Sequence, residues 1–558
     1  MAIITINKKI FEKEIGRLND EMQNQIALFG TPVEKVTQED LQIEVFPNRP
    51  DLLSYHGFKR AFKAFLGKNT GLRKYKVRKP EKNYKVIIDS SVRDVRPYTA
   101  CAIIRGLRLD DERIKEIIEM QEKLHLTVGR KRKKMAIGVY PLEKISLPIH
   151  FKAVEPDKIK FVPLESKREM SGLEILQKHP AGKEYSHLLA GKVKFPIFID
   201  NKKKILSMPP IINSQLTGKF TNKTRDVFVE CSGFDFQILE KSLNIIVTSL
   251  AEMGGKIYQM DLKGMRGPGV KSRTPDLDPE EVNLKIENAE KLLGIKLSEK
   301  DVRKLLGKMG IDYEKNLAKV PAWRVDILHE VDLIEDVAIA YGYDNFIPEI
   351  PDISTIGKED VKESIKRKIS ELLSGLGMIE ILNHHLTNKE NQISKMGLKD
   401  KELKEVFEIK ESKTDSDLLR GNLTHQSLKI LSENINSEYP QKLFEVGKIF
   451  EEKNGRIIEV EKLSCSIAPG GFTEIKQTLE HFSKMLGIEE KIKIIESSSQ
   501  ENVKHFIEGR IAEIKFDEKT IGFIGEIHPK ILKNWKIKMP VALFEIELDN
   551  ILEELEKS

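Results

Sequence analysis

The sequence predicts an α+β protein of several domains, and three observations support this prediction. The chain has 558 residues, which is more than one hydrophobic core usually serves, so roughly three or four domains are expected. Hydrophobic residues make up 40% of the sequence, enough to fill packed cores. Strand-like and helix-like segments are mixed along most of the chain, as is typical of α+β domains.

Residues 1–84 are predicted to form an N-terminal α/β module. A short strand-like segment at residues 3–6 precedes a helix-like run at residues 10–29, and a basic linker poor in apolar residues closes the module. The module also contains RPDLL at residues 49–53, which recurs as RVDIL at residues 324–328. An apolar helix-like stretch follows both segments. We therefore expect one scaffold that is used twice.

The two copies of this scaffold differ in charge. Three aligned positions are acidic only in the second copy, with Asp332, Glu335 and Asp336 there against Gly57, Arg60 and Ala61 in the first. Asp326 adds a fourth carboxylate, and Mg²⁺ prefers oxygen ligands of this kind. The alternative is that Asp332 and Glu335 form a capping box and complement the helix dipole without a metal. The residues by themselves leave both interpretations open.

Residues 85–270 are predicted to form a larger α+β domain, with strands such as YTACAIIRGLRL and DVFVECSGFD and a helix at residues 111–125. Its last third is dense in small or amide-bearing polar residues, namely Asn213, Ser214, Thr217, Thr224, Asp226, Glu230 and Ser232. Such side chains can line a pocket that recognises hydroxyls and amines. The alternative is that some of them only satisfy turns and helix caps.

A run of five basic residues, Arg130 to Lys134, lies in the same domain. A charge run is normally a solvated face of the protein. Lysine and arginine can also neutralise the phosphates of a nucleic acid, which gives an affinity that falls as the salt concentration rises. The sequence alone does not separate these two interpretations.

Residues 271–350 and 351–558 are predicted to form the last two domains. The first has two amphipathic helices at residues 282–295 and 297–311, a strand pair, and a third helix beginning at Asp332, the order expected of a winged-helix-like domain. A proline-rich connection follows. The second has long helices that flank strands such as KLFEVGKIF and VALFEIEL.

Charge, cysteine content and hydropathy exclude several classes of protein. The formal net charge of +6, from 93 basic and 87 acidic residues, is too small for a dedicated nucleic-acid coat. Cys101, Cys231 and Cys465 lie far apart without a CxxC partner, which argues against zinc and disulfides. No apolar run reaches the roughly 18 residues of a membrane helix, and the N-terminus lacks the apolar run of a signal peptide. We expect a cytoplasmic protein.

Five separated motifs, in order, resemble the β subunit of phenylalanyl-tRNA synthetase in its archaeal and eukaryotic form. They lie at residues 48–57, 121–138, 209–235, 323–343 and 523–529. The resemblance covers essentially the whole chain. It implies a phenylalanine–tRNA ligase subunit that supports ATP-dependent charging of tRNA(Phe) on a catalytic α subunit, within an (αβ)2 heterotetramer.

The resemblance also implies that residues 85–270 form an editing domain, which hydrolyses tyrosine wrongly attached to tRNA(Phe). A phenylalanine pocket cannot strongly reject an added hydroxyl, so a second site that demands the hydroxyl must correct the error. Glu230 is expected to read that hydroxyl. The other residues of the predicted pocket are Asn213, Ser214 and Thr224, which hold the amino acid or the attacking water, and Asp226, Gln121 and Arg132. Related chains often have threonine where this one has Ser232 and Phe234, which changes one edge of the pocket.

For the two C-terminal domains the resemblance implies a metal and an interface. Mg²⁺ is expected at Asp326, Asp332, Glu335 and Asp336, close to the partner subunit, with ATP as a substrate on the α subunit. Residues 351–558 resemble the antiparallel sheet of a class II synthetase. Arg420 could be mistaken for the phosphate-binding arginine of such a site, but no glycine-rich strand ending in Glu-Arg follows. We therefore expect no catalytic residues for aminoacylation here, and an interface with the α subunit instead.

Two other functions remain as alternatives. The first is a nucleic-acid-binding winged-helix protein without catalysis, which should present base-reading arginines and asparagines on an exposed helix. The helix segment VDLIEDVAIAYG is acidic and apolar instead. The second is a free-standing aminoacyl-tRNA deacylase, which would be active without a partner.

Overall fold

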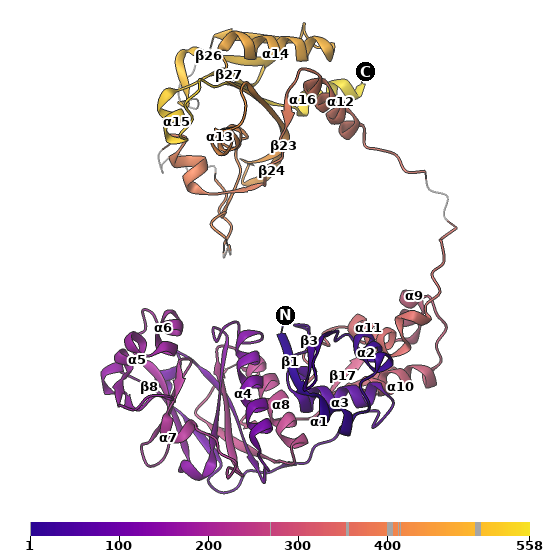
Figure 1. The fold of residues 1–558 in the computed structure, drawn as a ribbon, viewed down its shortest axis with the longest axis vertical. Helices are drawn as coiled ribbons and strands as arrows, with labels where there is room; N and C mark the ends of the chain where they lie inside the picture. Colours follow the sequence, from indigo (N-terminus) through magenta and orange to yellow (C-terminus); the bar gives the residue numbers. More distant parts are fainter. Residues whose placement is uncertain are drawn as a thin grey trace. The chain divides into compact units, whose positions relative to one another are not determined.

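The computed structural model divides the chain into two compact units, Met1–Ile350 and Pro351–Ser558 (Figure 1). It describes residues 2–267, 269–352, 356–398, 406–410, 412, 414–496 and 504–557. Helices and strands are mixed in both units, which confirms the α+β class. The division into four domains stays a prediction. No helix of the described residues combines the length and apolar character that a bilayer crossing requires.

The first unit begins with a three-stranded sheet of order β1-β3-β2, covered by short helices. The elements are β1 (Ala2–Asn7), α1 (Lys8–Glu14), α2 (Asp20–Leu28), β2 (Val33–Val36), β3 (Asp40–Val45) and α3 (Tyr55–Phe65). The single helix-like run that the sequence predicted is two helices. Gly16 breaks it with a φ of 154°, and the side chain of Asn19 then caps α2 by accepting from the Met22 N–H.

An eleven-stranded sheet forms the centre of the unit, along the path β13-β12-β11-β8-β5-β15-β6-β14-β7, with β4 and β16 paired to β15. Its strands are β4 (Val77–Arg78), β5 (Lys85–Ile88), β6 (Tyr98–Arg105), β7 (Met135–Pro141), β8 (Ile149–Val154), β11 (Phe195–Ile199), β12 (Ile205–Met208), β13 (Ile212–Asn213), β14 (Val227–Gly233), β15 (Lys256–Lys263) and β16 (Arg273–Thr274). Its helices are α4 (Asp111–Leu126), α5 (Gly172–Lys178), α6 (Pro180–Tyr185), α7 (Gln215–Gly218) and α8 (Phe236–Glu252). A separate short ribbon pairs β9 (Lys160–Phe161) with β10 (Met170–Ser171).

The unit ends with a small sheet of order β17-β19-β18 and three helices. The elements are β17 (Glu280–Asn283), α9 (Ile286–Leu293), α10 (Glu299–Lys308), β18 (Asp312–Glu314), β19 (Leu317–Val320) and α11 (Glu330–Tyr341). Residues 282–283 form a strand rather than the predicted start of a helix, because they pair with residues 317–318 of β19. One connected hydrophobic core runs from Ile4 to Ala340, so the parts of this unit are packed together.

The second unit has a seven-stranded sheet of order β20-β23-β24-β28-β27-β26-β25, antiparallel except for the β20–β23 pair. The strands are β20 (Ile379–Glu380), β23 (Gln441–Lys453), β24 (Arg456–Ala468), β25 (Ile492–Glu496), β26 (Phe506–Phe516), β27 (Lys519–Ile527) and β28 (Ala542–Glu547), with a separate pair β21 (Leu386–Thr387) and β22 (Leu418–Leu419). Alternate residues of β28 enter two different cores, Phe544 with one and Leu543 with the other. Helices cover both faces: α12 (Val361–Gly375), α14 (Phe472–Met485) and α16 (Asp549–Lys557) on the Phe544 side, and α13 (Thr424–Glu433) and α15 (Pro529–Asn534) on the other.

Candidate functional site

A cavity of about 820 Å³ lies in the first unit, lined by residues of α4, β7, β13, β14 and α6. Four of the seven residues predicted for the editing pocket line it: Gln121, Arg132, Asn213 and Glu230. They come from two separate parts of the chain, residues 121–132 and 213–230. The sheet brings them together because β14 pairs directly with β7, along the whole length of both strands.

Glu230 lies at the inner wall of this cavity with only 2% of its surface exposed. Its Oε1 accepts a hydrogen bond from the Tyr140 hydroxyl at 3.1 Å, and its Oε2 has no partner among the described residues. Burial raises the pKa of Glu230 to about 8, although the nearby Arg96 guanidinium acts in the opposite direction. The carboxyl is therefore mostly protonated at neutral pH, and it can donate as well as accept.

Tyr140 connects Glu230 to Asn213. Its hydroxyl lies 3.1 Å from Glu230 Oε1 and 3.3 Å from Asn213 Oδ1, and its one hydrogen can serve only one of them at a time. Sequence analysis did not identify Tyr140. Gly138, opposite Glu230 on β7, makes room for the pair, because a Cβ at this position would overlap the Tyr140 hydroxyl and approach Glu230 Oε1 to 2.5 Å.

Three polar groups that belong to residues lining the cavity are buried without a partner in the described part of the chain. They are Glu230 Oε2, Ser207 Oγ and Arg132 Nε. Buried polar atoms are nearly always hydrogen-bonded in folded proteins, so several orphans around one cavity point to a polar ligand or to water in it.

Arg132 is a fixed part of the cavity wall. Its Nη1 donates to the Ile211 carbonyl at 2.8 Å, its Nη2 donates to Glu122 at 3.0 Å, and its guanidinium lies 4.5 Å from the centre of the Tyr185 ring. The backbone turn that carries it has positive φ angles of 46°, 53° and 64° at residues 130–132. The other four residues of the basic run are exposed, as expected of a solvated face.

Ser214, Thr224 and Asp226 lie outside the residues that line the cavity. Ser214 caps α7 by accepting from the Leu216 N–H at 3.3 Å, and Thr224 Oγ1 accepts from the Thr221 N–H at 3.2 Å. Asp226 holds Arg105 Nε at 3.0 Å. For these three residues the cap-and-turn interpretation accounts for the side-chain contacts.

The edge formed by Ser232 and Phe234 also lies outside the cavity lining. The buried Arg96 donates from Nε to Ser232 Oγ at 3.1 Å and from Nη2 to the Ser232 carbonyl at 2.5 Å. Its guanidinium lies 5.5 Å from the centre of the Phe234 ring, and that ring is half exposed. The absent threonine hydroxyl at position 234 therefore does not change the wall of the cavity.

Neither histidine of the cavity wall is free to act as a general base. His125 Nε2 accepts from the Ile137 N–H at 2.8 Å, its Nδ1 faces Glu122 at 3.3 Å, and burial lowers its pKa. His179 Nδ1 accepts from the Ala181 N–H at 3.2 Å, and its Nε2 lies 3.1 Å from the Leu164 carbonyl. Both ring nitrogens of each histidine are already engaged.

The four predicted magnesium ligands do not converge on one point. Arg324 holds Asp326 through Nε at 2.9 Å and through Nη2 at 2.7 Å, and the same Nη2 holds Asp336 at 2.8 Å. Asp332 Oδ2 accepts from the N–H groups of residues 328 and 329 at 2.7 and 2.8 Å, and Glu335 is exposed. Among the described residues no group of three or more His, Cys, Asp or Glu could hold a metal ion. As folded in this chain, the four carboxylates do not fit a four-ligand site.

The predicted capping box is also different in detail. The helix α11 begins at Glu330, two residues before the predicted start, so Asp332 lies inside its first turn. Asp332 reaches back to the backbone before the helix and does not pair with Glu335. A carboxylate in the first turn still complements the helix dipole.

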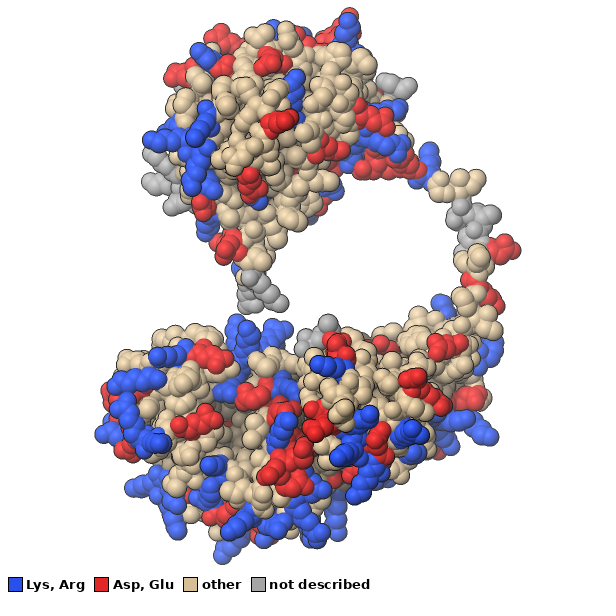
Figure 2. All heavy atoms as spheres, viewed as in Figure 1, with Lys and Arg blue, Asp and Glu red and all other residues tan. Residues whose placement is uncertain are grey.

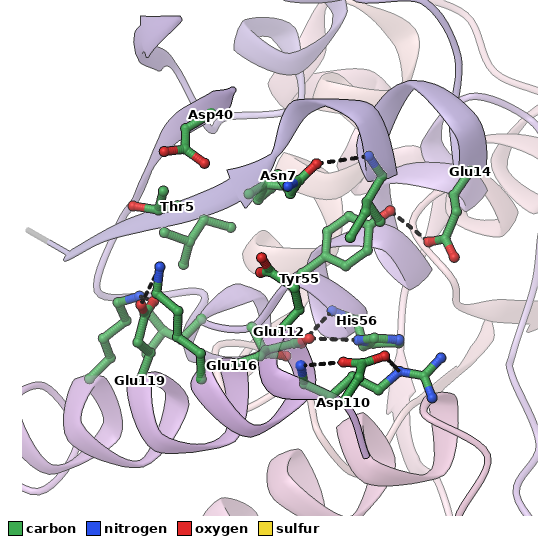
Figure 3. A pocket seen from close by; sticks show the side chains of 18 of the residues that line it. Thr5, Asn7, Glu14, Asp40, Tyr55, His56, Asp110, Glu112, Glu116 and Glu119 are labelled. Carbon is green, nitrogen blue, oxygen red and sulfur yellow. Dashed lines mark hydrogen bonds and ion pairs between the residues drawn. The ribbon is translucent and has the colours of Figure 1, made fainter. Parts of the chain in front are cut away.

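A second cavity of the first unit, of about 250 Å³, is rich in acidic residues, as Figure 3 shows. Several of these groups already have partners. Glu116 accepts from the His56 N–H and lies 2.8 Å from His56 Nδ1, and Glu14 accepts from the Tyr55 hydroxyl at 2.6 Å. These contacts are structural: the first joins the N-terminal module to the helix α4, and the second joins α1 to α3 within the module.

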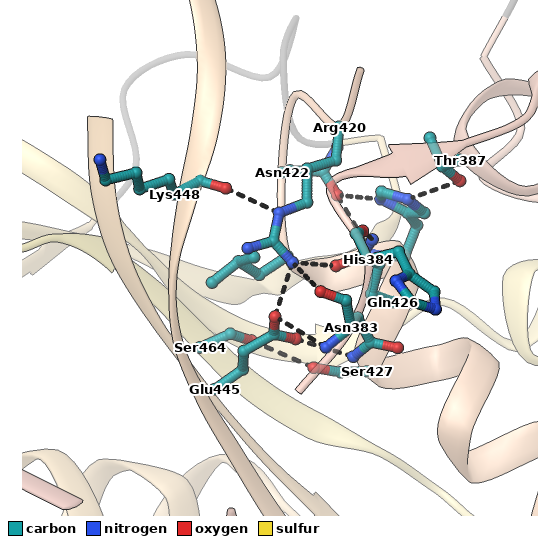
Figure 4. A network of polar contacts seen from close by, with 12 residues as sticks. Asn383, His384, Thr387, Arg420, Asn422, Gln426, Ser427, Glu445, Lys448 and Ser464 are labelled. Carbon is teal, nitrogen blue, oxygen red and sulfur yellow. Dashed lines mark hydrogen bonds and ion pairs between the residues drawn. The ribbon is translucent and has the colours of Figure 1, made fainter. Parts of the chain in front are cut away.

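In the second unit Arg420 is buried in a network of polar contacts (Figure 4). Its Nη1 donates to Glu445 Oε1 at 2.6 Å and to Gln426 Oε1 at 2.7 Å, and its Nε donates to the Lys448 carbonyl at 2.6 Å. Asn383 Nδ2 donates to the other oxygen of Glu445 at 2.8 Å. A buried carboxylate thus occupies the position that a phosphate would need at this arginine.

Two family models match the chain. The model described as "Phenylalanyl tRNA synthetase beta chain CLM domain" matches residues 347–548, and that described as "tRNA synthetase B5 domain" matches residues 282–343.

Similar proteins match over most of the chain. The phenylalanine–tRNA ligase beta subunit of Thermococcus sibiricus is 41% identical over 510 residues, 90% of this chain and 89% of that protein. The beta subunit of Pyrococcus furiosus is 39% identical over 565 residues, 98% of this chain and 99% of that protein. A crystal structure of an N-terminal fragment of the Pyrococcus horikoshii beta subunit is 38% identical, with a TM-score of 0.57, and covers 61% of this chain and 99% of the fragment.

Proposed function

The chain belongs to the family of phenylalanine–tRNA ligase beta subunits, and from this premise we propose that its first unit removes tyrosine from mischarged tRNA(Phe). A beta subunit implies an alpha subunit as its partner and tRNA(Phe) as a ligand. We further propose that the two subunits form an (αβ)2 heterotetramer, in which phenylalanine is activated with ATP on the alpha subunit.

The unpaired oxygen of Glu230 carries the editing proposal. A tyrosine side chain in the cavity brings a phenolic hydroxyl that can both donate and accept a hydrogen bond. A protonated carboxyl can accept a hydrogen bond from this hydroxyl or donate one to it. A phenylalanine ring would displace water from Glu230 Oε2 and leave this oxygen without a partner. Leaving a buried polar group unsatisfied costs about 1–3 kcal/mol. The cavity therefore selects tyrosine for hydrolysis and spares phenylalanine.

Hydrolysis requires a water molecule to attack the ester carbonyl that joins the amino acid to the tRNA ribose. The new bond joins the water oxygen to the carbonyl carbon, the bond to the ribose oxygen breaks, and one proton of the water passes to that ribose oxygen. Free tyrosine and tRNA then leave. Asn213 is the residue we assign to holding the amino acid or this water, because its side chain lies on the cavity wall beside Tyr140. Gln121 and Arg132 complete the wall. Ser214, Thr224 and Asp226 lie outside the cavity lining, and we assign them no direct contact with the substrate.

Magnesium remains a proposal for the assembled ligase. Asp332 and Glu335 lie on the exposed side of α11, and Mg²⁺ commonly takes one or two carboxylates and keeps its other ligands as water. Asp326 and Asp336 would have to leave Arg324 in order to join them. No step of the editing reaction depends on this metal.

Release of tyrosine from tyrosyl-tRNA(Phe) by the purified αβ complex tests the proposal. We expect the parent complex to hydrolyse tyrosyl-tRNA and to spare phenylalanyl-tRNA, and Glu230→Ala to lose this preference while charging with phenylalanine continues. Glu143→Gln, at an exposed position of the same region, is the matched control. A Glu230→Ala complex that hydrolyses tyrosyl-tRNA at the parent rate would refute the role of Glu230.

A further inference from the structure

The two copies of the repeated scaffold fold alike. In each copy an arginine holds both oxygens of the aspartate two residues later. The contacts are 2.9 and 2.9 Å between Arg49 and Asp51, and 2.9 and 2.7 Å between Arg324 and Asp326. The copies also meet, because α3 of the first packs against α10, next to the second. Residues of both copies line one cavity of about 190 Å³.

The lining of this cavity is strongly cationic. Six basic residues line it, against two carboxylates: Arg49, Lys59, Arg60, Lys63, Arg73 and Arg324, with Asp51 and Glu252. Both carboxylates are engaged, since Asp51 is held by Arg49, and Glu252 accepts from the Tyr75 hydroxyl at 2.6 Å and lies 3.4 Å from Arg73. Lys59 is paired with Glu14 at 3.0 Å, outside the lining.

Two of these arginines have buried N–H groups without a partner. Arg324 is 3% exposed, its Nε and Nη2 hold Asp326 and Asp336, and its Nη1 is unpaired. Arg60 donates from Nη1 to the Tyr75 hydroxyl at 3.1 Å, while its Nε and Nη2 are buried and unpaired. No carboxylate of the described residues forms an ion pair with Arg60. Its guanidinium lies 4.4 Å from the centre of the Trp323 ring.

We propose that this cavity binds a phosphate group, through the unpaired N–H groups of Arg60 and Arg324 and the charge of Lys63. Arginine N–H groups in a fixed fork match the oxygens of phosphate, and a buried arginine with donors to spare is a prepared anion site. The two arginines come from different copies, so the site exists only where the copies meet. The first copy has Arg60 where the second has Glu335, and this difference adds to the positive charge of the cavity.

Phosphate in this cavity can come from the solution or from the backbone of a bound RNA. Both sources offer the same oxygens. Only RNA carries further phosphates beside the one in the cavity. The slope of log K against log salt for RNA binding therefore reports the number of phosphates that the protein contacts. This difference allows one set of variants to distinguish the sources.

The test uses the αβ complex and the fluorescence of Trp323. This chain has two tryptophans, and Trp535→Phe leaves only the one beside Arg60. A reference complex that also carries Trp323→Phe gives the emission of the alpha subunit, which is subtracted. Titration with inorganic phosphate, at an ionic strength held constant with chloride, should change Trp323 emission in a saturable way. Arg60→Gln and, separately, Lys63→Gln should each weaken this binding by about tenfold or more. Lys82→Gln, at an exposed position away from the cavity, is the matched control and should leave it unchanged.

The same variants are then measured for tRNA binding at several salt concentrations. If an RNA phosphate occupies the cavity, Arg60→Gln should lower the slope of log K against log salt by about 0.7 to 0.9. If free phosphate occupies it, phosphate binding weakens in Arg60→Gln and the tRNA slope stays as in the parent. A parent complex without saturable phosphate binding, or binding that neither Arg60→Gln nor Lys63→Gln weakens, would overturn the proposal.

Discussion

Glu230 and Glu445 are two glutamates on β strands with almost no exposed surface, 2% and 0% respectively. Glu445 has Arg420 at 2.6 Å and Asn383 at 2.8 Å, so both its oxygens are used inside the protein. Glu230 has no ion-pair partner within contact distance among the described residues, and one of its oxygens faces a cavity unpaired. Burial alone therefore does not identify a binding residue. Glu230 differs from Glu445 in having an oxygen without a hydrogen-bond partner and in lining a cavity.

The charges on the surface are less useful than these buried groups for locating a binding site. Figure 2 shows lysines and arginines mixed with acidic residues over the face that it presents. The small net charge of +6 is consistent with this mixture. The predictions below test which buried groups have their hydrogen bonds satisfied inside the protein and which are open to a ligand.

The largest effect is expected when the buried ion pair between Arg420 and Glu445 is broken. Glu445→Ala leaves the Arg420 guanidinium buried without its carboxylate, which should lower the free energy of unfolding of the second unit by about 3–5 kcal/mol. Denaturant unfolding of the full chain measures this loss. The double variant Glu445→Leu with Arg420→Met should lose much less than the single one, because it leaves no buried charge. A double variant as unstable as Glu445→Ala would mean that the pair is not a closed unit.

The open glutamate should make stability depend on pH. The pKa of Glu230 is about 8 in the folded protein, against an ordinary value of 4.5 for an exposed glutamate, so the folded state binds more protons between these values. Its favourable contribution is complete below about pH 4.5 and is lost as pH rises through about 8. The slope should reach at most about 1.4 kcal/mol per pH unit. Thermal unfolding of Glu230→Gln and the parent, compared across this range, should show that the parent loses more stability than the variant as pH rises, by up to this slope.

Removal of the open glutamate should affect editing more than folding. Glu230→Ala should slow hydrolysis of tyrosyl-tRNA(Phe) by about fivefold to 150-fold, which corresponds to the loss of about 1–3 kcal/mol of hydrogen bonding to the phenol. Single-turnover release of tyrosine measures the rate. Tyr140→Phe should give a smaller loss, because it removes a neighbour of Glu230 and leaves the carboxyl in place. Equal rates in the parent and in both variants would mean that the cavity does not read the hydroxyl.

The smallest effect is expected for a polar residue outside the cavity. Thr224→Ala removes one hydrogen bond of a turn, so it should cost about 0.5–1.5 kcal/mol of stability. Editing should continue at the parent rate, because Thr224 does not line the cavity. Chemical unfolding and tyrosine release on the same preparation measure both quantities. A loss of editing without a loss of stability would mean that Thr224 belongs to the editing pocket.

Much of the protein was predictable from the sequence. The order of five motifs indicated the family, and the comparisons confirm it. The recurrence of RPDLL as RVDIL indicated one scaffold used twice, and both copies form the same arginine–aspartate contact. These features are local, because a motif or a contact between residues i and i+2 depends on neighbours along the chain. Glu230 was expected in the pocket from the dense group of polar residues and from the family resemblance, and it lines the cavity.

The tertiary structure decided which partners these residues have. Tyr140 was not predicted, because nothing near it in the sequence shows that β7 pairs with β14 and so brings Tyr140 close to Glu230. The sequence predicted that Asp326 and Asp336 form one acidic cluster with their neighbours, but Arg324 is paired with both carboxylates. Whether a buried polar group is satisfied depends on strands and helices from distant parts of the chain. The sequence therefore determined the family and the candidate residues, and packing alone decided which of them remain open to a ligand.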